Sequence, residues 1–243
     1  MKISIIGDSF CADMGNDPYP SWLYLLKHEL PAEILCKGMK GAPLIHSFIP
    51  FEKNLSNSDL VIICVTDPGR IPNKYEISLA QGAWDNNSKE EVVNSMLKTA
   101  ETIDSSIPVE LSPKEIISER SVPITEYEAE KLYDSIISFN KWIRHDEFMK
   151  IQHRALLREM EYMIKKENKN VIWFRNFESS WPKWKPRIGV WGNKNLRVLP
   201  KDGGFSGETN HLSQKDNDSM FKFIKKIIED DDYTPREIKM EFS

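Results

Sequence analysis

Short apolar runs alternate with amphipathic stretches along the first seventy residues of the chain. The runs Ile3–Ile6, Glu33–Cys36 and Asp59–Val65 are each followed by glycine or by a polar turn, a pattern typical of buried strands in a parallel sheet. Between them, Ser21 precedes the apolar segment that starts at Trp22, and a second helical stretch covers part of Ile45–Leu55. The order β-α-β-α-β predicts a doubly wound parallel sheet.

The pattern changes between residues 71 and 123, which are polar and contain several prolines. Only Lys89–Ile103 has the spacing of a short helix. Connections this long inside a compact domain are uncommon and are often active-site lids. We interpret residues 71–123 as an insertion or lid, with a plain surface excursion as the alternative.

Helical spacing returns after this segment. Thr125 and Glu128 have the spacing of a capping box, and apolar positions from Leu132 to Met163 then recur every three or four residues. This stretch predicts one long helix, or two helices joined near His145.

The remaining elements alternate in the same way. Val171–Phe174 is the next predicted strand, and Leu196–Leu199 is either a last strand or a loop. Ser213 caps a final amphipathic helix, and the acidic tail from Asp230 onward is expected to be a loose extension. We therefore predict one three-layer α/β/α domain over residues 1–243, with a central parallel, flavodoxin-like sheet, an inserted segment and a long helix.

Composition narrows the class of protein. A hydrophobic content of 40%, a charged content of 29% and a net charge of −4 are typical of a globular domain. Because Lys and Arg are spread along the chain, we expect no nucleic-acid partner. The three cysteines form no CxxC pair, so neither a disulfide framework nor a metal site is expected.

The N-terminal residues and the apolar runs indicate where in the cell the protein is expected. The first residues lead directly into a strand, without the apolar stretch of a signal peptide, and no window reaches the roughly 18 apolar residues of a membrane span. We expect synthesis in the cytoplasm and no membrane partner. The long helical stretch makes self-association an open alternative.

Candidate chemistry gathers at one edge of the predicted sheet. Ser9, the stretch Gly38–Gly41, the turn Thr66–Arg70 and the loop ending at His211 all follow predicted strands or precede the last helix. Ligands of open α/β sheets bind outside the carboxyl ends of the strands. Ser9 is the candidate nucleophile, His211 the candidate base, and Glu208 the carboxylate that orients the imidazole.

These blocks resemble the SGNH/GDSL hydrolase family. Gly7-Asp8-Ser9 is similar to its first block, Cys36 to Gly41 to its second, and His211 before the last helix to its final block. The resemblance implies acyl transfer from a small-molecule or glycan ester without a cofactor. It also implies that the oxyanion is held by backbone N–H groups, above all that of Gly41, with Gly38 in the same block.

The third block departs from the family pattern, and this keeps other functions open. The family has Asn as an oxyanion donor where this chain has Asp67, and an ionised carboxylate cannot donate; Arg70 or Asn73 is a possible replacement. One alternative is a non-catalytic binding or structural module, for example a phage virion component that assembles into a larger particle. A metal-dependent phosphoesterase using Asp8 and Asp67 is a weaker alternative, because a paired histidine set is missing.

Overall fold

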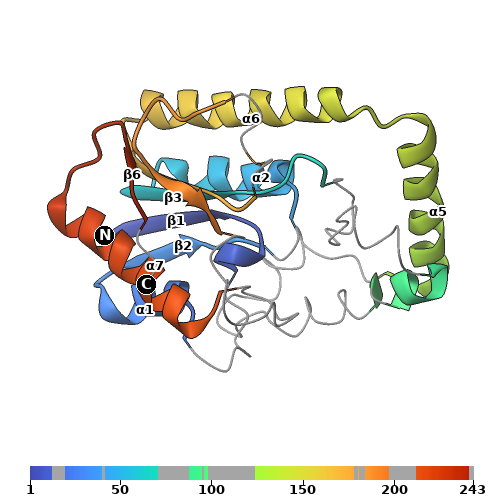
Figure 1. Ribbon diagram of the computed structural model, residues 1–243, viewed down its shortest axis with the longest axis horizontal. Helices are drawn as coiled ribbons and strands as arrows, with labels where there is room; N and C mark the ends of the chain where they lie inside the picture. The colour runs from blue at the N-terminus through green and yellow to red at the C-terminus, as the bar shows by residue number, and fades with distance from the viewer. Residues whose placement is uncertain are drawn as a thin grey trace.

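The computed structural model gives most of the chain as one layered α/β structure (Figure 1). The residues that it describes are 1–12, 20–39, 42–70, 88–94, 96–97, 124–177, 180, 184–196 and 212–240.

Strands and helices alternate along the described chain. In chain order they are β1 (Lys2–Gly7), the short 3-10 helix η1 (Ser9–Cys11), α1 (Trp22–Glu29), β2 (Glu33–Cys36), α2 (Leu44–Leu55), β3 (Leu60–Val65), α5 (Glu126–Trp142), α6 (Asp146–Lys166), β4 (Asn170–Arg175), β5 (Val190–Asn195), α7 (Gln214–Asp230) and β6 (Arg236–Ile238).

The strands form one six-stranded sheet in the order β2-β1-β3-β4-β5-β6. Every neighbouring pair is parallel, which confirms the predicted parallel sheet. The chain runs from β1 outward to β2 and then returns to place β3 on the other side of β1. This reversal is a topological switch point, and the crevice between the carboxyl ends of β1 and β3 is where such sheets bind ligands.

Helices cover both faces of the sheet and bury a separate core on each. On one face α1 and α7 pack on alternate strand residues, among them Ile5 and Ile62. On the other face α2 and α6 pack on the intervening residues, among them Ile63 and Trp173. Strand β3 is buried along its whole length, so its continuous apolar run follows from having a helical layer on each side.

The long helical stretch is two helices, α5 and α6, which meet at a corner (Figure 1). His145 has an extended backbone and stands as the N-cap of α6, so the junction predicted near His145 is confirmed. Thr125 and Glu128 form both hydrogen bonds of the predicted capping box.

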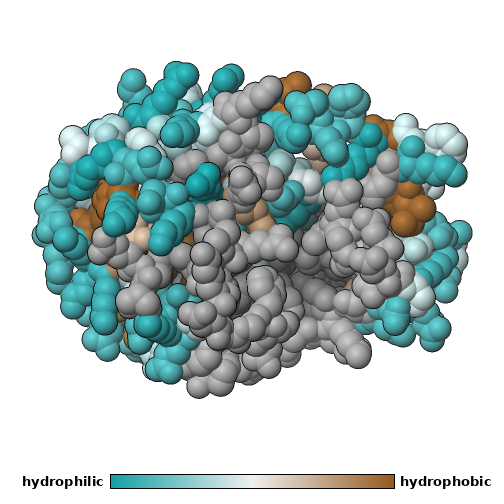
Figure 2. All heavy atoms as spheres, in the orientation of Figure 1, coloured by the Kyte–Doolittle hydropathy of each residue, from teal (hydrophilic) through white to brown (hydrophobic). Residues whose placement is uncertain are grey.

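Helix α5 belongs to a small apolar cluster apart from the sheet cores. Its Ala129 and Ile136 pack with Val92, Val93 and Met96, which come from the part of the predicted insertion that is described and helical. Apolar side chains are exposed where α5 meets α6, including Trp142 and Ile143, and Figure 2 shows brown atoms among the teal at that end of the molecule.

The structure bears on two sequence predictions about the end of the chain. Strand β5 was not predicted and ends just before Leu196–Leu199, where a strand or a loop was expected; Leu196 is buried just past its end, and residues 197–199 lie outside the described residues. The tail is not a loose extension, because β6 pairs with β5 and the buried Met240 donates its backbone N–H to Asn193 Oδ1 at 2.8 Å.

Within the described ranges, no helix is both long enough and apolar enough to cross a membrane.

Candidate functional site

A buried carboxylate, that of Asp8, organises the sheet edge at the switch point. Its Oδ1 accepts hydrogen bonds from the backbone N–H of Phe10 and from Asn176 Nδ2. Its Oδ2 accepts from Thr66 Oγ1 at 2.9 Å and lies 3.0 Å from Arg70 Nη2. These partners follow β1, β3 and β4, so Asp8 ties together the carboxyl ends of three adjacent strands.

Asp8 also sets the position of Ser9. Its carboxylate caps η1, the single turn that Ser9 begins, and this turn leaves Ser9 buried with 3% of its surface exposed. Gly7 has a φ of +148°, and an added Cβ there would lie 2.8 Å from Cys11 Sγ. The chain therefore needs glycine to turn out of β1 toward Ser9.

The second block, Cys36 to Gly41, contacts the same turn through Gly38 and Met39. The Gly38 N–H donates to Cys11 O at 3.0 Å, and the Met39 N–H donates to Gly7 O at 3.0 Å. A Cβ on Gly38 would lie 2.7 Å from Asp8 O. Gly38 thus supports η1 by close packing, and its N–H is already used within the fold.

The turn after β3 holds Arg70 against Asp8. Asp67 Oδ1 accepts the Gly69 N–H at 2.6 Å, and Asp67 O accepts the Arg70 N–H at 3.3 Å. The Arg70 guanidinium carbon lies 5.5 Å from the centre of the Phe177 ring, a cation–π distance. Asp67 therefore shapes this turn through its carboxylate.

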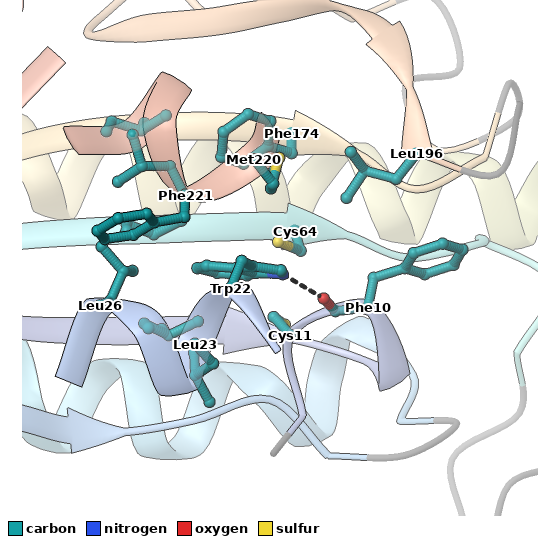
Figure 3. Packing of buried hydrophobic residues seen from close by; sticks show 14 of the residues in the cluster. Phe10, Cys11, Trp22, Leu23, Leu26, Cys64, Phe174, Leu196, Met220 and Phe221 are labelled. Atoms are coloured by element: carbon teal, nitrogen blue, oxygen red, sulfur yellow. Dashed lines mark hydrogen bonds between the residues drawn. The ribbon is translucent and has the colours of Figure 1, made fainter. Parts of the chain in front are cut away.

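A chain of hydrogen bonds connects the Ser9 turn to the start of α7, and Figure 3 shows its first member, the bond between Trp22 and Phe10. Trp22 Nε1 donates to Phe10 O at 2.8 Å, and the Trp22 N–H donates to Asn217 Oδ1 at 2.9 Å. Asn217 Nδ2 in turn donates to Leu212 O at 3.2 Å. Phe10 and Leu212 belong to the same buried cluster, so the residue after Ser9 and the residue after His211 share one core.

The predicted site residues divide into two groups. Ser9, Gly38, Asp67 and Arg70 lie at the carboxyl edge of the sheet, as expected. His211, Glu208 and Gly41 lie outside the described residues.

Three polar residues of this edge were given no role of their own from the sequence, although Thr66 begins the candidate turn Thr66–Arg70. Thr66 and Asn176 have no motif of their own, although each directly follows a strongly apolar strand. His153 lies on α6 and is buried, with Nε2 3.0 Å from Ser180 O. Burial lowers the pKa of His153 to about 4, although the Ser180 carbonyl and the charge of Asp67 oppose this shift, so His153 is neutral at pH 7.

The cysteines lie near one another beneath the same edge. Cys11 and Cys64 are fully buried, whereas Cys36 is half-buried. Burial, together with the Cys64 thiol beside it, raises the pKa of Cys11 well above its ordinary value. A thiol that stays protonated is a weak nucleophile, so this burial does not favour Cys11 as a reactive group.

Comparison with protein-family models, curated proteins and solved structures finds no match to this chain.

Proposed function

We propose that this protein is a serine-dependent ester hydrolase of the SGNH/GDSL type. The observation that carries the proposal is the hydrogen-bonded path from Phe10 through Trp22 and Asn217 to Leu212. It connects Phe10, the residue after Ser9, to Leu212, the residue after His211, within one core. A nucleophile and its base must be held in this way if their side chains are to meet.

The mechanism that we propose is acyl transfer to Ser9. His211 takes the hydroxyl proton as Ser9 attacks the ester carbonyl, and Glu208 accepts the other imidazole N–H. The backbone N–H groups of Ser9 and Gly41 stabilise the oxyanion. His211 then protonates the leaving alcohol, and water hydrolyses the acyl-enzyme. The substrate is a small-molecule or glycan ester.

A second candidate function is a non-catalytic binding or structural module of the same fold. The observation that favours it concerns one residue each from the second and third blocks, Gly38 and Asp67. The Gly38 N–H is bonded to Cys11 O, and the Asp67 carboxylate accepts a bond from Gly69 N–H. The Gly38 N–H is thus used within the fold and the Asp67 carboxylate acts as an acceptor, and loss of one oxyanion donor typically costs about 10²–10³ in rate.

Hydrolysis of short-chain 4-nitrophenyl esters distinguishes the two functions. We expect turnover by the wild type and a loss of at least about 10³-fold in kcat for Ser9→Ala. Ser4→Ala is the matched control, since Ser4 is a buried serine of β1 and its partner Ser58 Oγ keeps a bond to Asn54 O. It should fold and retain the wild-type rate.

A fluorophosphonate probe tests the nucleophile without a substrate. Mass spectrometry should find the label on Ser9 in the wild type and in Ser4→Ala. Absence of both labelling and turnover across a panel of acyl esters would favour the non-catalytic module.

A further inference from the structure

Two side chains around Asp8 each keep one buried polar atom without a partner. Within the part of the chain that the structure describes, Arg70 Nη1 and Asn176 Oδ1 make no hydrogen bond. Arg70 contacts Asp8 through Nη2, and Asn176 donates from Nδ2 to Asp8 and to Cys64 O. One buried donor and one buried acceptor are therefore left over beside the same carboxylate.

Such atoms are costly to keep. A buried polar group without a partner loses about 1–3 kcal/mol, and more when it is charged, so most native proteins satisfy these groups. Arginine commonly binds a carboxylate through two nitrogens, but Arg70 contacts Asp8 through Nη2 alone. This single-nitrogen contact leaves Nη1 buried without a hydrogen bond.

Arg70 and Asn176 lie at the carboxyl edge of the sheet, where open α/β sheets bind ligands. Arg70 follows β3 and Asn176 follows β4, on the edge that carries Ser9 after β1. Asp8 exposes none of its side-chain surface, while Arg70 exposes 9%, so Arg70 forms the outer part of the cluster. Phe177 lies against Arg70 and makes an edge-on contact with Phe10, at 5.7 Å between ring centres. Phe177 therefore connects Arg70 to Phe10, the residue next to Ser9.

Charge selects the kind of ligand. The Asp8–Arg70 pair is neutral as a whole, and Asp67 adds a further carboxylate nearby. Among the described residues of this edge, the charges are those of Asp8, Asp67 and Arg70, which sum to one negative charge. An uncharged group avoids repulsion by this charge, and a hydroxyl both accepts and donates, which matches one unused donor and one unused acceptor.

We propose that Arg70 Nη1 and Asn176 Oδ1 form a subsite for a hydroxyl group of an uncharged, polyhydroxylated ester such as an O-acylated sugar. The choice of an ester as the ligand rests on the proposed hydrolase function. Binding at the subsite does not itself require turnover. It makes the hydroxylated part of the ligand a specificity determinant next to Ser9.

The experiment measures binding to Ser9→Ala protein by calorimetry with two matched esters. These are methyl 6-O-acetyl-glucopyranoside and cyclohexylmethyl acetate, which lacks the ring hydroxyls. We expect the sugar ester to bind at least about tenfold more tightly, a ratio that corresponds to one buried hydrogen bond. Adding Arg70→Lys keeps a cation for Asp8 but removes Nη1, and should bring the two affinities to within about twofold.

Two controls separate this effect from damage to the fold. Thr66→Val removes another Asp8 hydrogen bond but leaves both unused atoms, so the ratio should persist. Arg158→Lys changes an exposed arginine on α6 and should also leave the ratio of the two affinities unchanged. If Arg70→Lys does not fold, Asn176→Ser tests the acceptor in its place and should lower the ratio.

Equal affinities in the Ser9→Ala protein, or a ratio that survives both Arg70→Lys and Asn176→Ser, would overturn the subsite. Turnover by the wild type without a preference for the sugar ester would also reject it while leaving the hydrolase intact. A binding preference without turnover would reject the hydrolase and keep the subsite.

Discussion

Asp8 and Arg70 form an ion pair of 3.0 Å in which neither side chain exposes more than 9% of its surface. Asp8→Asn removes the negative charge that pairs with the buried guanidinium. Removing one partner of a buried pair typically costs about 3–5 kcal/mol. We expect a loss of that size in the free energy of unfolding, measured by urea denaturation at pH 7.

The double variant Asp8→Asn/Arg70→Met provides the control for this prediction. Because both charges are gone, its loss should be smaller than the sum of the two single losses. Lys150→Met breaks the exposed pair with Glu147 and should change stability by less than about 1 kcal/mol. A simple additive result in the double variant would contradict direct coupling of Asp8 and Arg70.

Asn217 joins the first turn of α7 to the start of α1. Asn217→Ala leaves the Trp22 N–H without its acceptor and removes the donor to Leu212 O. Because these groups are buried, we expect a loss of about 1–3 kcal/mol in the free energy of unfolding. If His211 acts on Ser9, kcat for ester hydrolysis should fall as well.

Asn54→Ala is the matched control for Asn217→Ala. Asn54 donates one side-chain hydrogen bond, to Pro50 O within α2, and does not connect two elements. It should cost less stability than Asn217→Ala and leave kcat unchanged. An equal effect of both variants on kcat would show that α7 is not held specially by Asn217.

Elements with a strong local signal were predicted from the sequence. Strand β3 is a continuous β-branched run because helices cover both of its faces, and this burial is visible in the composition alone. Ser21, Thr125 and Ser213 each cap a helix as predicted, because a cap depends on bonds within one turn. Ser9 at the end of β1 followed from the same local reasoning.

Features that depend on distant partners were not predicted. Strand β6 has only three residues and forms by pairing with β5. Asn176 meets Asp8 across 168 positions of the sequence, and no local pattern marks such a pair. The role of Asp67 in shaping its own turn also became visible only with the backbone in place.

The reactivity of the cysteines should follow their burial. Cys11 and Cys64 are buried, and burial raises the pKa of Cys11 well above its ordinary value. We expect Ellman's reagent to react with at most one thiol in the native protein at pH 8, and with all three in 6 M guanidinium. Cys36→Ser should abolish the native reaction, whereas rapid modification of two thiols in the folded wild type would contradict the buried position of Cys11.

His153 should make stability depend on pH. Its pKa is about 4 in the folded protein, below the ordinary value of 6.5, chiefly because burial disfavours the charged ring. As the pH falls, the unfolded chain therefore binds the proton first. The contribution of His153 to the free energy of unfolding is therefore complete above pH 6.5. Between pH 6.5 and pH 4 it declines by about 1.4 kcal/mol per pH unit, and by about pH 4 it is lost.

His153→Gln isolates this contribution from that of the carboxylates, because glutamine does not titrate and its amide can still donate to Ser180 O. We expect the free energy of unfolding of the variant, measured by urea denaturation between pH 7 and pH 4, to fall less steeply than that of the wild type. The difference should lie between pH 6.5 and pH 4 and reach about 3 kcal/mol. Parallel curves for the two proteins would mean that His153 already accepts a proton in the folded state near its ordinary pKa, which its burial on α6 opposes.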